Sequence, residues 1–458
     1  MNLTKRLPDL PDDIVTQTDQ APHIDIPDVT AVPPVPAVLA RHWYALAILT
    51  LIYACHFLDR MMVSIIVEPV RREFSLSDGQ IGLLTGLAYG VMFALAGIPL
   101  GLMIDRMNRV KLLALLVAIW SGMTAFSSVA QNFVQLLIAR MGVGASEAGG
   151  SPTSLSLISD LFPPSKRSTA VGCFFLSNAV GAVLAIFIGG FVAAKYGWRS
   201  AMLMAGVPGM ILAVVLILSV REPRRGAMDT NTVNKLDGDT TARAAPGLME
   251  VVREIARERA MLHLLAGISL ASAGVATIGA WLPAFVMRFH GLNIKEAGLA
   301  VALASGFFGA FGSVIGGMAS DRLAKTRARR RMDISAVVCI SAAALAIVGL
   351  LLPGASTAVG ALCVAMMVAF VVFPAAFGGM LGLAKPHMRG TTSASMQICV
   401  NLVGYGFGPA LVGILSDRFG GGQSLRYAMI SVICLCFPWA ALHFCLSARA
   451  FDRRRKSE

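Results

Sequence analysis

Twelve apolar segments, each about as long as a helix that crosses a membrane, follow one another from Trp43 onward with only short polar breaks. A helix needs about 20 apolar residues to cross a bilayer. Only helices suit such segments, because backbone groups in lipid must find their hydrogen-bond partners within the segment. The sequence therefore predicts an all-α membrane protein with twelve transmembrane helices. They are expected near residues 43–68, 79–103, 110–129, 132–158, 168–193, 200–220, 261–287, 296–319, 333–353, 356–383, 391–416 and 425–447.

The composition and the distribution of charge agree with this class. Of the 458 residues, 56% are apolar and 14% are charged, whereas a soluble domain carries about 25% charged residues. A soluble enzyme is therefore excluded. If both termini lie on one side, 29 of the 39 Lys and Arg residues fall in segments on that side and 8 in the opposite loops. This bias predicts that both termini are cytoplasmic, so the net charge of +13 does not indicate nucleic-acid binding.

The chain divides into two halves of six segments each. We expect a disordered cytoplasmic tail, a first six-helix bundle, a cytoplasmic loop, a second six-helix bundle and a basic cytoplasmic tail. Their residues are 1–40, 41–220, 221–260, 261–447 and 448–458 respectively.

Short motifs repeat between the halves. Gly101-x-x-x-Asp105-Arg106 recurs as Gly317-x-x-x-Asp321-Arg322, and Asn178-x-x-Gly181 recurs as Asn401-x-x-Gly404, at nearly constant offsets. Such repeats indicate a duplicated six-helix unit. Two units of this kind enclose a central site in secondary transporters.

Four charged residues lie well inside the predicted spans: Asp59, Arg60, Arg140 and Glu147. Each costs at least about 2.5 kcal/mol at the bilayer centre, and such residues mark transport pathways by default. Helical spacing places Arg140 and Glu147 on one face, and His56 on one face with Asp59 and Arg60. We expect the two acids and two arginines to pair between the first and fourth spans.

Two interpretations of this cluster remain open. It could fix helix register, or it could be a switch in which protonation of Asp59 or Glu147 leaves an excess positive charge that favours an anionic substrate. Burial and a neighbouring arginine act on a carboxylate in opposite directions, so the sequence leaves open which acid titrates. His56 fits either proton handling or packing.

Two further sets of residues are candidates for gating and for the cavity wall. Gly101, Asp105, Arg106 and Arg109 follow the second span, where a carboxylate can face the positive end of a helix from the other half and Arg109 can pair with acids at helix ends. Such contacts predict an inner gate that breaks on opening; the alternative is that these charges only set the topology. The second copy, Asp321-Arg322, is either solvated charge or a second latch. The expected cavity-wall residues are Ser151, Thr277, Trp281, Gln397, Asn401 and Tyr405.

No zinc-binding, nucleophile-elbow or phosphate-loop motif occurs in the sequence. We therefore expect no enzymatic activity, no cofactor and no metal. The expected partners are the lipid bilayer, protons and a small amphiphilic or organic-anion substrate, with the protein acting as a monomer. A membrane receptor that does not transport is a further alternative, but it would have no need of the duplicated gate motif.

The motif Gly101-x-x-x-Asp105-Arg106-x-x-Arg109-x-Lys111 is similar to the signature of the major facilitator superfamily, although Asn108 stands where glycine is usual. Arg140-x-x-x-Gly144 resembles the helix-4 motif of that superfamily. The resemblance implies the major facilitator fold, with two six-helix bundles. The antiporter signature of the fifth span is missing from 178–190, which argues against a drug antiporter.

Within that superfamily, three stretches resemble bacterial Spinster-like transporters: Phe57-Leu-Asp59-Arg60, Gly144-Ala-Ser-Glu147-Ala-Gly-Gly-Ser151-Pro152 and Ser159-Asp160-Leu-Phe-Pro163-Pro164-x-x-Arg167. The resemblance implies proton-coupled, alternating-access transport of a lysophospholipid or sphingoid-type lipid across the bacterial inner (plasma) membrane. It also implies that Asp59, Arg60 and Glu147 couple protons or contact substrate. The anion–cation–porter branch shares the Asp-Arg pair, so proton symport of small carboxylic acids is the alternative.

Overall fold

The computed structural model describes residues 38–225, 228, 248–324, 328–385 and 388–457. Across these ranges every regular element is a helix, and no strand occurs. The predicted tail 1–40 lies almost wholly outside the described residues, as does most of the polar loop after the sixth span.

The first half contains six spans, several of them built from two consecutive helices. The sixth span begins inside α9, where Gly197 has φ 83° and breaks the helical path. The helices are α1 (Ala40–Phe74), α2 (Asp78–Gly82) with α3 (Ala88–Arg106), α4 (Arg109–Ser127), α5 (Phe133–Glu147) with α6 (Gly150–Leu161), α7 (Pro164–Phe175) with α8 (Ser177–Leu184), and α9 (Ala193–Ser219).

The second half repeats this arrangement after a short helix, α10 (Leu248–Arg257). Its spans are α11 (Arg259–His290), α12 (Ile294–Val301) with α13 (Gly309–Ala324), α14 (Ala328–Leu351), α15 (Ala355–Phe370) with α16 (Val372–Leu383), α17 (Arg389–Cys399) with α18 (Gly408–Phe419), and α19 (Ser424–Ser457).

Polar caps in the short connections explain where several helices begin. The side chains of Ser77, Asn108, Asn132 and Asn293 each accept a hydrogen bond from the backbone N–H three residues later. These bonds satisfy amides that have no partner inside the helix. At the other end of a span, Gly291 closes α11 in the left-handed conformation, φ 64°, which glycine adopts without steric cost.

The second, fifth, eighth and eleventh spans each contain a π-helical segment. These segments are Leu83–Leu87, Ala185–Val192, Ala302–Phe308 and Val400–Phe407. A π-helical turn widens the backbone and shifts the side chains that follow it, and such turns are frequent at functional sites. Their equivalent places in the two halves agree with the predicted duplication.

Ten helical stretches in the described residues are long and apolar enough to cross a membrane. The longest, Thr169–Ser219, has 51 residues and forms two spans that meet at Gly197. One more span is split between α5 and α6, and it carries Arg140 and Glu147. Together they make twelve, so the predicted all-α fold with twelve transmembrane helices is confirmed.

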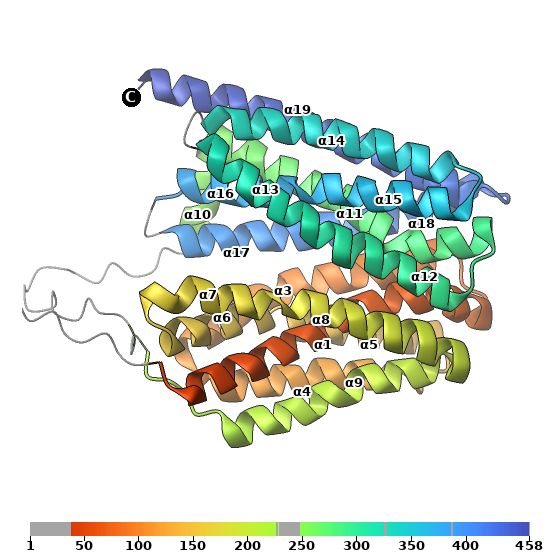
Figure 1. Cartoon of the computed structure of the whole chain (residues 1–458), viewed down its shortest axis with the longest axis horizontal. Helices are drawn as coiled ribbons and strands as arrows, with labels where there is room; N and C mark the ends of the chain where they lie inside the picture. Colours follow the sequence, from red (N-terminus) through yellow and green to blue (C-terminus); the bar gives the residue numbers. More distant parts are fainter. Residues whose placement is uncertain (1–37, 226–227, 229–247, 325–327, 386–387, 458) are drawn as a thin grey trace, which may run out of the picture. The chain divides into compact units, whose positions relative to one another are not determined.

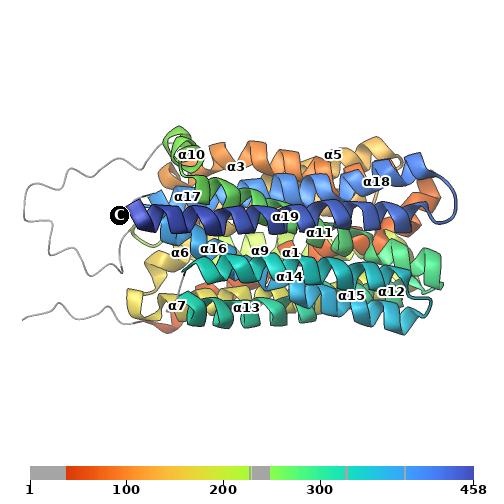
Figure 2. The same ribbon diagram turned by 90° about the horizontal axis from the view of Figure 1, so that it is seen from above.

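Within residues 38–458, the helices of the first half lie on one side and those of the second half on the other (Figure 1). α1 begins and α19 ends at the same end, which we call the proximal end; the opposite end is the distal end. α19 packs against α11, α14 and α18 (Figure 2). One apolar core includes Met62 of the first half with Leu282 and Val301 of the second, so the halves share a packed interface.

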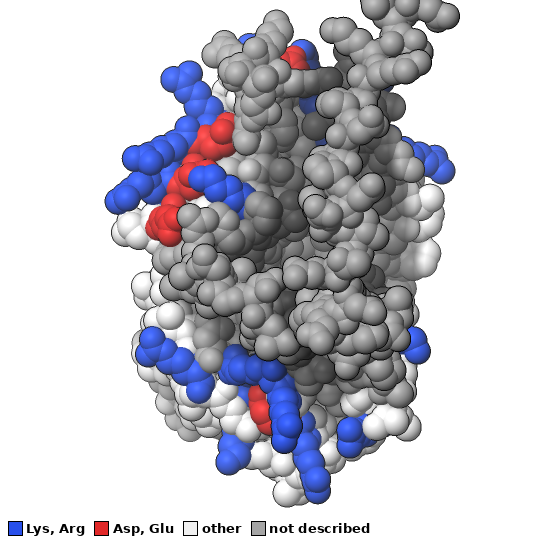
Figure 3. All heavy atoms as spheres, turned by 90° about the vertical axis from the view of Figure 1, so that its left-hand side faces the viewer, with Lys and Arg blue, Asp and Glu red and all other residues white. Residues whose placement is uncertain are grey.

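Lys and Arg predominate among the charged residues visible at the proximal end (Figure 3). Arg106, Lys111, Lys166 and Arg322 are exposed there. This is the end that the distribution of charge assigns to the cytoplasm.

Candidate functional site

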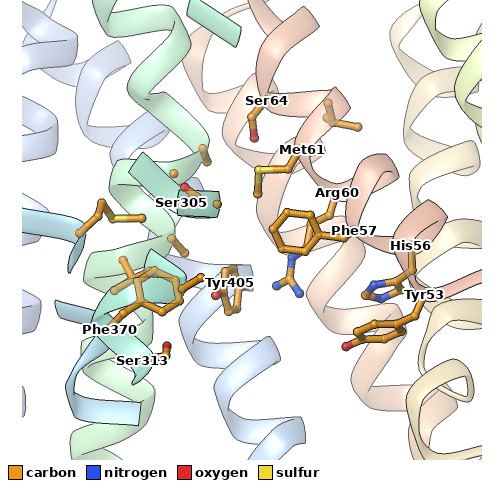
Figure 4. A pocket seen from close by; sticks show the side chains of 18 of the residues that line it. Tyr53, His56, Phe57, Arg60, Met61, Ser64, Ser305, Ser313, Phe370 and Tyr405 are labelled. Carbon is orange, nitrogen blue, oxygen red and sulfur yellow. The ribbon is translucent and has the colours of Figure 1, made fainter. Parts of the chain in front are cut away.

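A cavity of about 590 Å³ lies between the two halves, near the middle of the spans (Figure 4). Its walls come from α1, α3, α5 and α7 on one side and from α11, α13, α15 and α18 on the other. Most of the lining is apolar, with large side chains that include Phe57, Met61, Phe175, Leu176, Met366 and Phe370. A pocket of this size is typical of small-molecule sites.

Arg60 presents a cation to this cavity from α1 (Figure 4). Its Nη2 donates a hydrogen bond to Oδ1 of Asn401 at 3.2 Å, and its guanidinium lies 3.7 Å from the centre of the Tyr405 ring. Asn401 is held in turn, because its Nδ2 donates to the backbone oxygen of Gln397 at 2.9 Å. Asn401 and Tyr405 belong to the π-helical segment of the eleventh span, so Arg60 joins the two halves.

Glu147 lies beside the cavity and is 2% exposed. Its Oε2 accepts a hydrogen bond from the Tyr89 hydroxyl at 2.8 Å and lies 3.2 Å from Nε2 of His56. His56 stacks on Tyr53, with ring centres 4.8 Å apart. A buried carboxylate held by a hydroxyl and an imidazole has neighbours through which a proton can be exchanged.

Asp59 is also buried, at 2% exposure, and neither of its carboxylate oxygens makes a hydrogen bond of ordinary geometry. The polar side chains near Asp59 are those of Thr124, Arg140 and Glu147. An ionised carboxylate without hydrogen bonds is costly to bury. Asp59 is therefore a second buried acid of this cluster, in surroundings that differ from those of Glu147.

The expectation that the two acids pair with the two arginines is wrong. Among the described residues, neither Arg60 nor Arg140 has a carboxylate oxygen within the 4.0 Å of an ion pair. The arginines lie over aromatic rings instead, with Arg140 5.2 Å from the ring centre of Tyr89. Cation–π contact of this kind stabilises a partly desolvated guanidinium, while Glu147 takes its partners from His56 and Tyr89.

Gly144 brings the second and fourth spans into close contact. A Cβ atom at this position would lie 2.5 Å from the backbone oxygen of Tyr89, so only glycine allows the two backbones to approach this closely. The approach places the hydroxyl of Tyr89 against Glu147, which lies about one turn after Gly144 in α5. Tyr89 and Tyr53 were missed by the sequence reasoning, although a tyrosine inside an apolar span is itself a signal.

The predicted cavity-wall residues have different surroundings. Tyr405 lines the cavity, and Asn401 is buried beside it against Arg60. Ser151 interacts with Tyr53, which lines the cavity. Three others do not line the cavity. Thr277 and Trp281 are fully buried, and the Trp281 indole donates a hydrogen bond to the backbone oxygen of Pro409 at 3.0 Å. The side chain of Gln397 is exposed.

Arg109, from the predicted inner gate, is a buried brace within the first half. Its guanidinium donates to Asp160 at 2.5 Å, to Glu222 at 2.7 Å and to the Ser156 hydroxyl at 2.9 Å. These partners lie at the end of α6 and in the segment after α9, so Arg109 fastens that segment to the start of α4. Arg109 thus pairs with acids of its own half, one of them at a helix end as expected, and its role in an inner gate stays a prediction.

Among the other predicted gate residues, those that the structure describes make no hydrogen bond or ion pair between the halves. Arg106 and Arg322 are exposed, and a Cβ atom on Gly101 would meet nothing within 4 Å. The side chains of Asp105 and Asp321 lie outside what the structure describes, so their gate role stays a prediction.

Within the described residues, no group of three or more His, Cys, Asp or Glu side chains could hold a metal ion. The eight cysteines are unpaired.

A family model described as the Major Facilitator Superfamily matches residues 49–409. The chain belongs to the major facilitator superfamily. The fold, the duplicated halves and the central cavity are those of a membrane transporter rather than an enzyme.

Particular members resemble the chain over most of its length. A crystal structure of a bacterial homologue of the human lysosomal transporter Spinster, in an inward-facing and unoccupied conformation, has a TM-score of 0.81 and 28% identity and covers 91% of this chain and 99% of its own. The predicted resemblance to Spinster-like transporters is thereby confirmed.

Three curated relatives carry different names. The MFS-type efflux pump of Mycolicibacterium smegmatis is 26% identical, with 90% of this chain and 94% of the relative covered. The probable L-galactonate transporter of Escherichia coli is 26% identical, with 90% of each chain covered. The sphingosine-1-phosphate transporter SPNS2 of Mus musculus is 26% identical, with 81% of this chain and 69% of the relative covered.

Proposed function

We propose that this protein is a proton-coupled secondary active transporter that moves an amphiphilic anion, a lysophospholipid or sphingoid-type lipid, by alternating access. The observation that carries the proposal is Arg60, which together with Arg140 is presented into a cavity whose other walls are mostly apolar. A guanidinium binds phosphate and carboxylate groups through paired hydrogen bonds. The apolar walls suit an acyl or sphingoid chain attached to such a headgroup.

A second, almost wholly apolar pocket of about 480 Å³ supports an amphiphilic substrate over a fully polar one. It lies between α8 and the middle of the eighth span, where the π-helical segment leads into α13, and its walls include Val183, Leu303 and Phe307. Gly306, Ala310 and Val314 line both this pocket and the central cavity. A substrate with its headgroup at Arg60 thus has adjoining apolar space for its chain.

Proton coupling is proposed for Glu147 and Asp59. A proton on Glu147 removes the negative charge that faces His56 and Tyr89, and it leaves Arg60 and Arg140 with less compensation. The site then attracts an anion more strongly, while loss of the proton favours release. Because a ligand shifts a conformational equilibrium only by its differential affinity for the two states, proton and substrate would favour the same rearrangement.

Proton symport of small carboxylic acids is the alternative. The relative named as an L-galactonate transporter supports it, and the polar pair of Arg60 and Asn401 offers a donor and an acceptor to a sugar acid. The large apolar share of the lining favours the amphiphile.

Flux into proteoliposomes that contain the purified protein tests the proposal. Lysophosphatidylglycerol, a sphingoid phosphate and a hexuronate are compared with and without an imposed pH gradient. Lipid movement that depends on the gradient supports the first function, and hexuronate uptake supports the alternative. If neither Glu147→Gln nor Asp59→Asn lowers gradient-driven flux, the coupling role is wrong.

We also propose the bacterial inner membrane, with both termini cytoplasmic, and a monomer as the working unit. The basic proximal end supports the orientation, since that end holds the start of α1 and the end of α19 (Figure 3). Protease accessibility of tags at either terminus in right-side-out and inverted vesicles tests the orientation.

A further inference from the structure

A second set of charged side chains joins the two halves at the distal end. It consists of Glu68 near the end of α1, Asp78 at the start of α2, Arg288 near the end of α11 and Asp417 near the end of α18. None of these residues lines the cavity. We propose that this distal ion cluster is a gate that holds the distal end closed, and that it must separate before the cavity can open toward that side.

Arg288 is the strongest link in the cluster. Its Nε lies 2.7 Å from Oε2 of Glu68, and its Nη1 lies 2.9 Å from Oδ1 of Asp78. Both acids are buried, at 2% and 5% exposure, so one guanidinium of the second half compensates two carboxylates of the first. Hydrogen bonds between charged groups in such surroundings are stronger than neutral ones.

Asp417 forms the second link, in which an acid of the second half binds the first half. Its carboxylate oxygens accept hydrogen bonds from the backbone amides of Asp78 at 2.9 Å and Gly79 at 2.8 Å. These amides begin the helical stretch Asp78–Ile104, whose positive end favours a carboxylate. The neighbouring Ser416 hydroxyl donates to Asp78 Oδ2 at 2.6 Å, so the eleventh span of one half caps the second span of the other.

Close backbone contacts surround the same links. A Cβ atom on Gly413 would lie 2.1 Å from the Asp78 oxygen, and one on Gly82 would lie 2.7 Å from the Pro409 oxygen. On the other side of the interface, Gly298 would meet the Gly190 Cα at 3.3 Å. At the proximal end a Cβ atom on Gly101 would meet nothing within 4 Å. The halves are thus pressed together at the distal end, where the ion cluster lies.

The first half can keep its two acids compensated after the halves separate. Arg71 Nε lies 3.1 Å from Asp78 Oδ1, and Arg72 Nε lies 3.3 Å from Glu68 Oε1. These arginines belong to the same half as the acids and move with them. Opening therefore leaves neither buried acid without a cation, which would be costly, and the closed and open arrangements can interconvert.

The sequence carries a signal for this gate that the analysis of the repeats did not use. Gly413-x-x-x-Asp417-Arg418 has the same spacing as Gly101-x-x-x-Asp105-Arg106. The earlier copy follows a span that ends at the proximal end, whereas this copy ends at the distal end. The same motif would thus stabilise closure at opposite ends of the transporter.

Distances between spin labels test the gate in lipid nanodiscs, with no substrate added. One pair, Lys195→Cys with Gln423→Cys, spans the distal end through two exposed positions; a second pair, Lys166→Cys with Arg330→Cys, spans the proximal end. The background is the full chain with its eight native cysteines replaced. Combining Arg288→Gln with Asp417→Asn is expected to raise the ratio of long to short distal distances on the order of tenfold, with a matching shortening of the proximal pair.

Matched variants keep the test decisive. Arg426→Gln is the control, because Arg426 lies at the same end but contacts Phe285 and Phe289 of its own half. If the double variant does not fold, Arg288→Lys keeps the charge and loses the two-pronged geometry, and an intermediate shift is expected. Distal distances that match the native ones in both Asp417→Asn and Arg288→Lys, or an equal shift in the control, would overturn the proposal. The readout needs no transport, so failure of the proposed substrate leaves it intact.

Discussion

Arg60 donates a hydrogen bond to Oδ1 of Asn401 at 3.2 Å, and this contact joins the first span of one half to the eleventh span of the other. The cation proposed to bind the substrate is therefore itself part of the interface between the halves. A bound anion would share the guanidinium with Asn401, so substrate binding acts directly on the contact that alternating access must change.

Replacing Asn401 by alanine should raise the KM for the anionic substrate about tenfold. Asn401 fixes one edge of the Arg60 guanidinium, and without it only the Tyr405 ring holds the side chain in place. Initial flux rates at several substrate concentrations give KM and maximal rate separately. Gln397→Ala is the matched control, because only the backbone oxygen of Gln397 contacts Asn401 and its side chain is exposed. An unchanged KM in Asn401→Ala would contradict the positioning role.

Replacing Tyr89 by phenylalanine should lower the stability of the protein, because Glu147 loses a hydrogen bond. The Tyr89 hydroxyl donates to Glu147 at 2.8 Å, and its loss leaves His56 as the remaining close partner. A double-mutant cycle with Glu147→Gln, measured by thermal unfolding in detergent, should give a coupling free energy of about 1 to 3 kcal/mol. Tyr427→Phe, at an exposed position, should show no coupling to Glu147. Additive effects of Tyr89→Phe and Glu147→Gln would show that the hydrogen bond contributes nothing.

Replacing Arg109 by alanine should destabilise the protein by about 3 to 5 kcal/mol, because it removes the buried guanidinium that contacts Asp160 and Glu222. Arg106→Ala, three residues earlier and exposed, should change stability by less than about 0.5 kcal/mol. Thermal unfolding compares the two. The brace interpretation also predicts that substrate-free distances between the halves stay unchanged in both variants. A large change in those distances with normal stability would restore the latch between the halves.

The fold followed from the sequence because its main constraint is one-dimensional. The length of an apolar segment decides whether it can cross a bilayer, and neighbouring residues settle that locally. The main error in counting spans would have come at Gly197, where two spans run together with little polar sequence between them. There the positive φ of one glycine separates the spans.

The sequence predicted which charged residues form the site, but not which contacts they make. Asp59, Arg60, Arg140 and Glu147 were identifiable because charge inside an apolar span is costly. Their partners depend on how each helix is rotated about its axis, and one residue changes that rotation by about 100°. The π-helical segment at Val400–Phe407 adds a further shift, which is why the contact between Arg60 and Asn401 was beyond a sequence argument.

Replacing Gly144 by alanine should both destabilise the protein and lower proton-driven flux. The new Cβ atom would lie 2.5 Å from the Tyr89 backbone oxygen, so the second span must move away from the fourth at a cost of about 1 to 3 kcal/mol. The same movement draws the Tyr89 hydroxyl away from Glu147. Gly122→Ala is the matched control, because a Cβ atom there meets nothing within 4 Å and should improve helix stability by up to about 1 kcal/mol. Thermal unfolding and flux measured on both variants decide the matter, and equal behaviour of the two would mean that the close approach at Gly144 supports neither packing nor coupling.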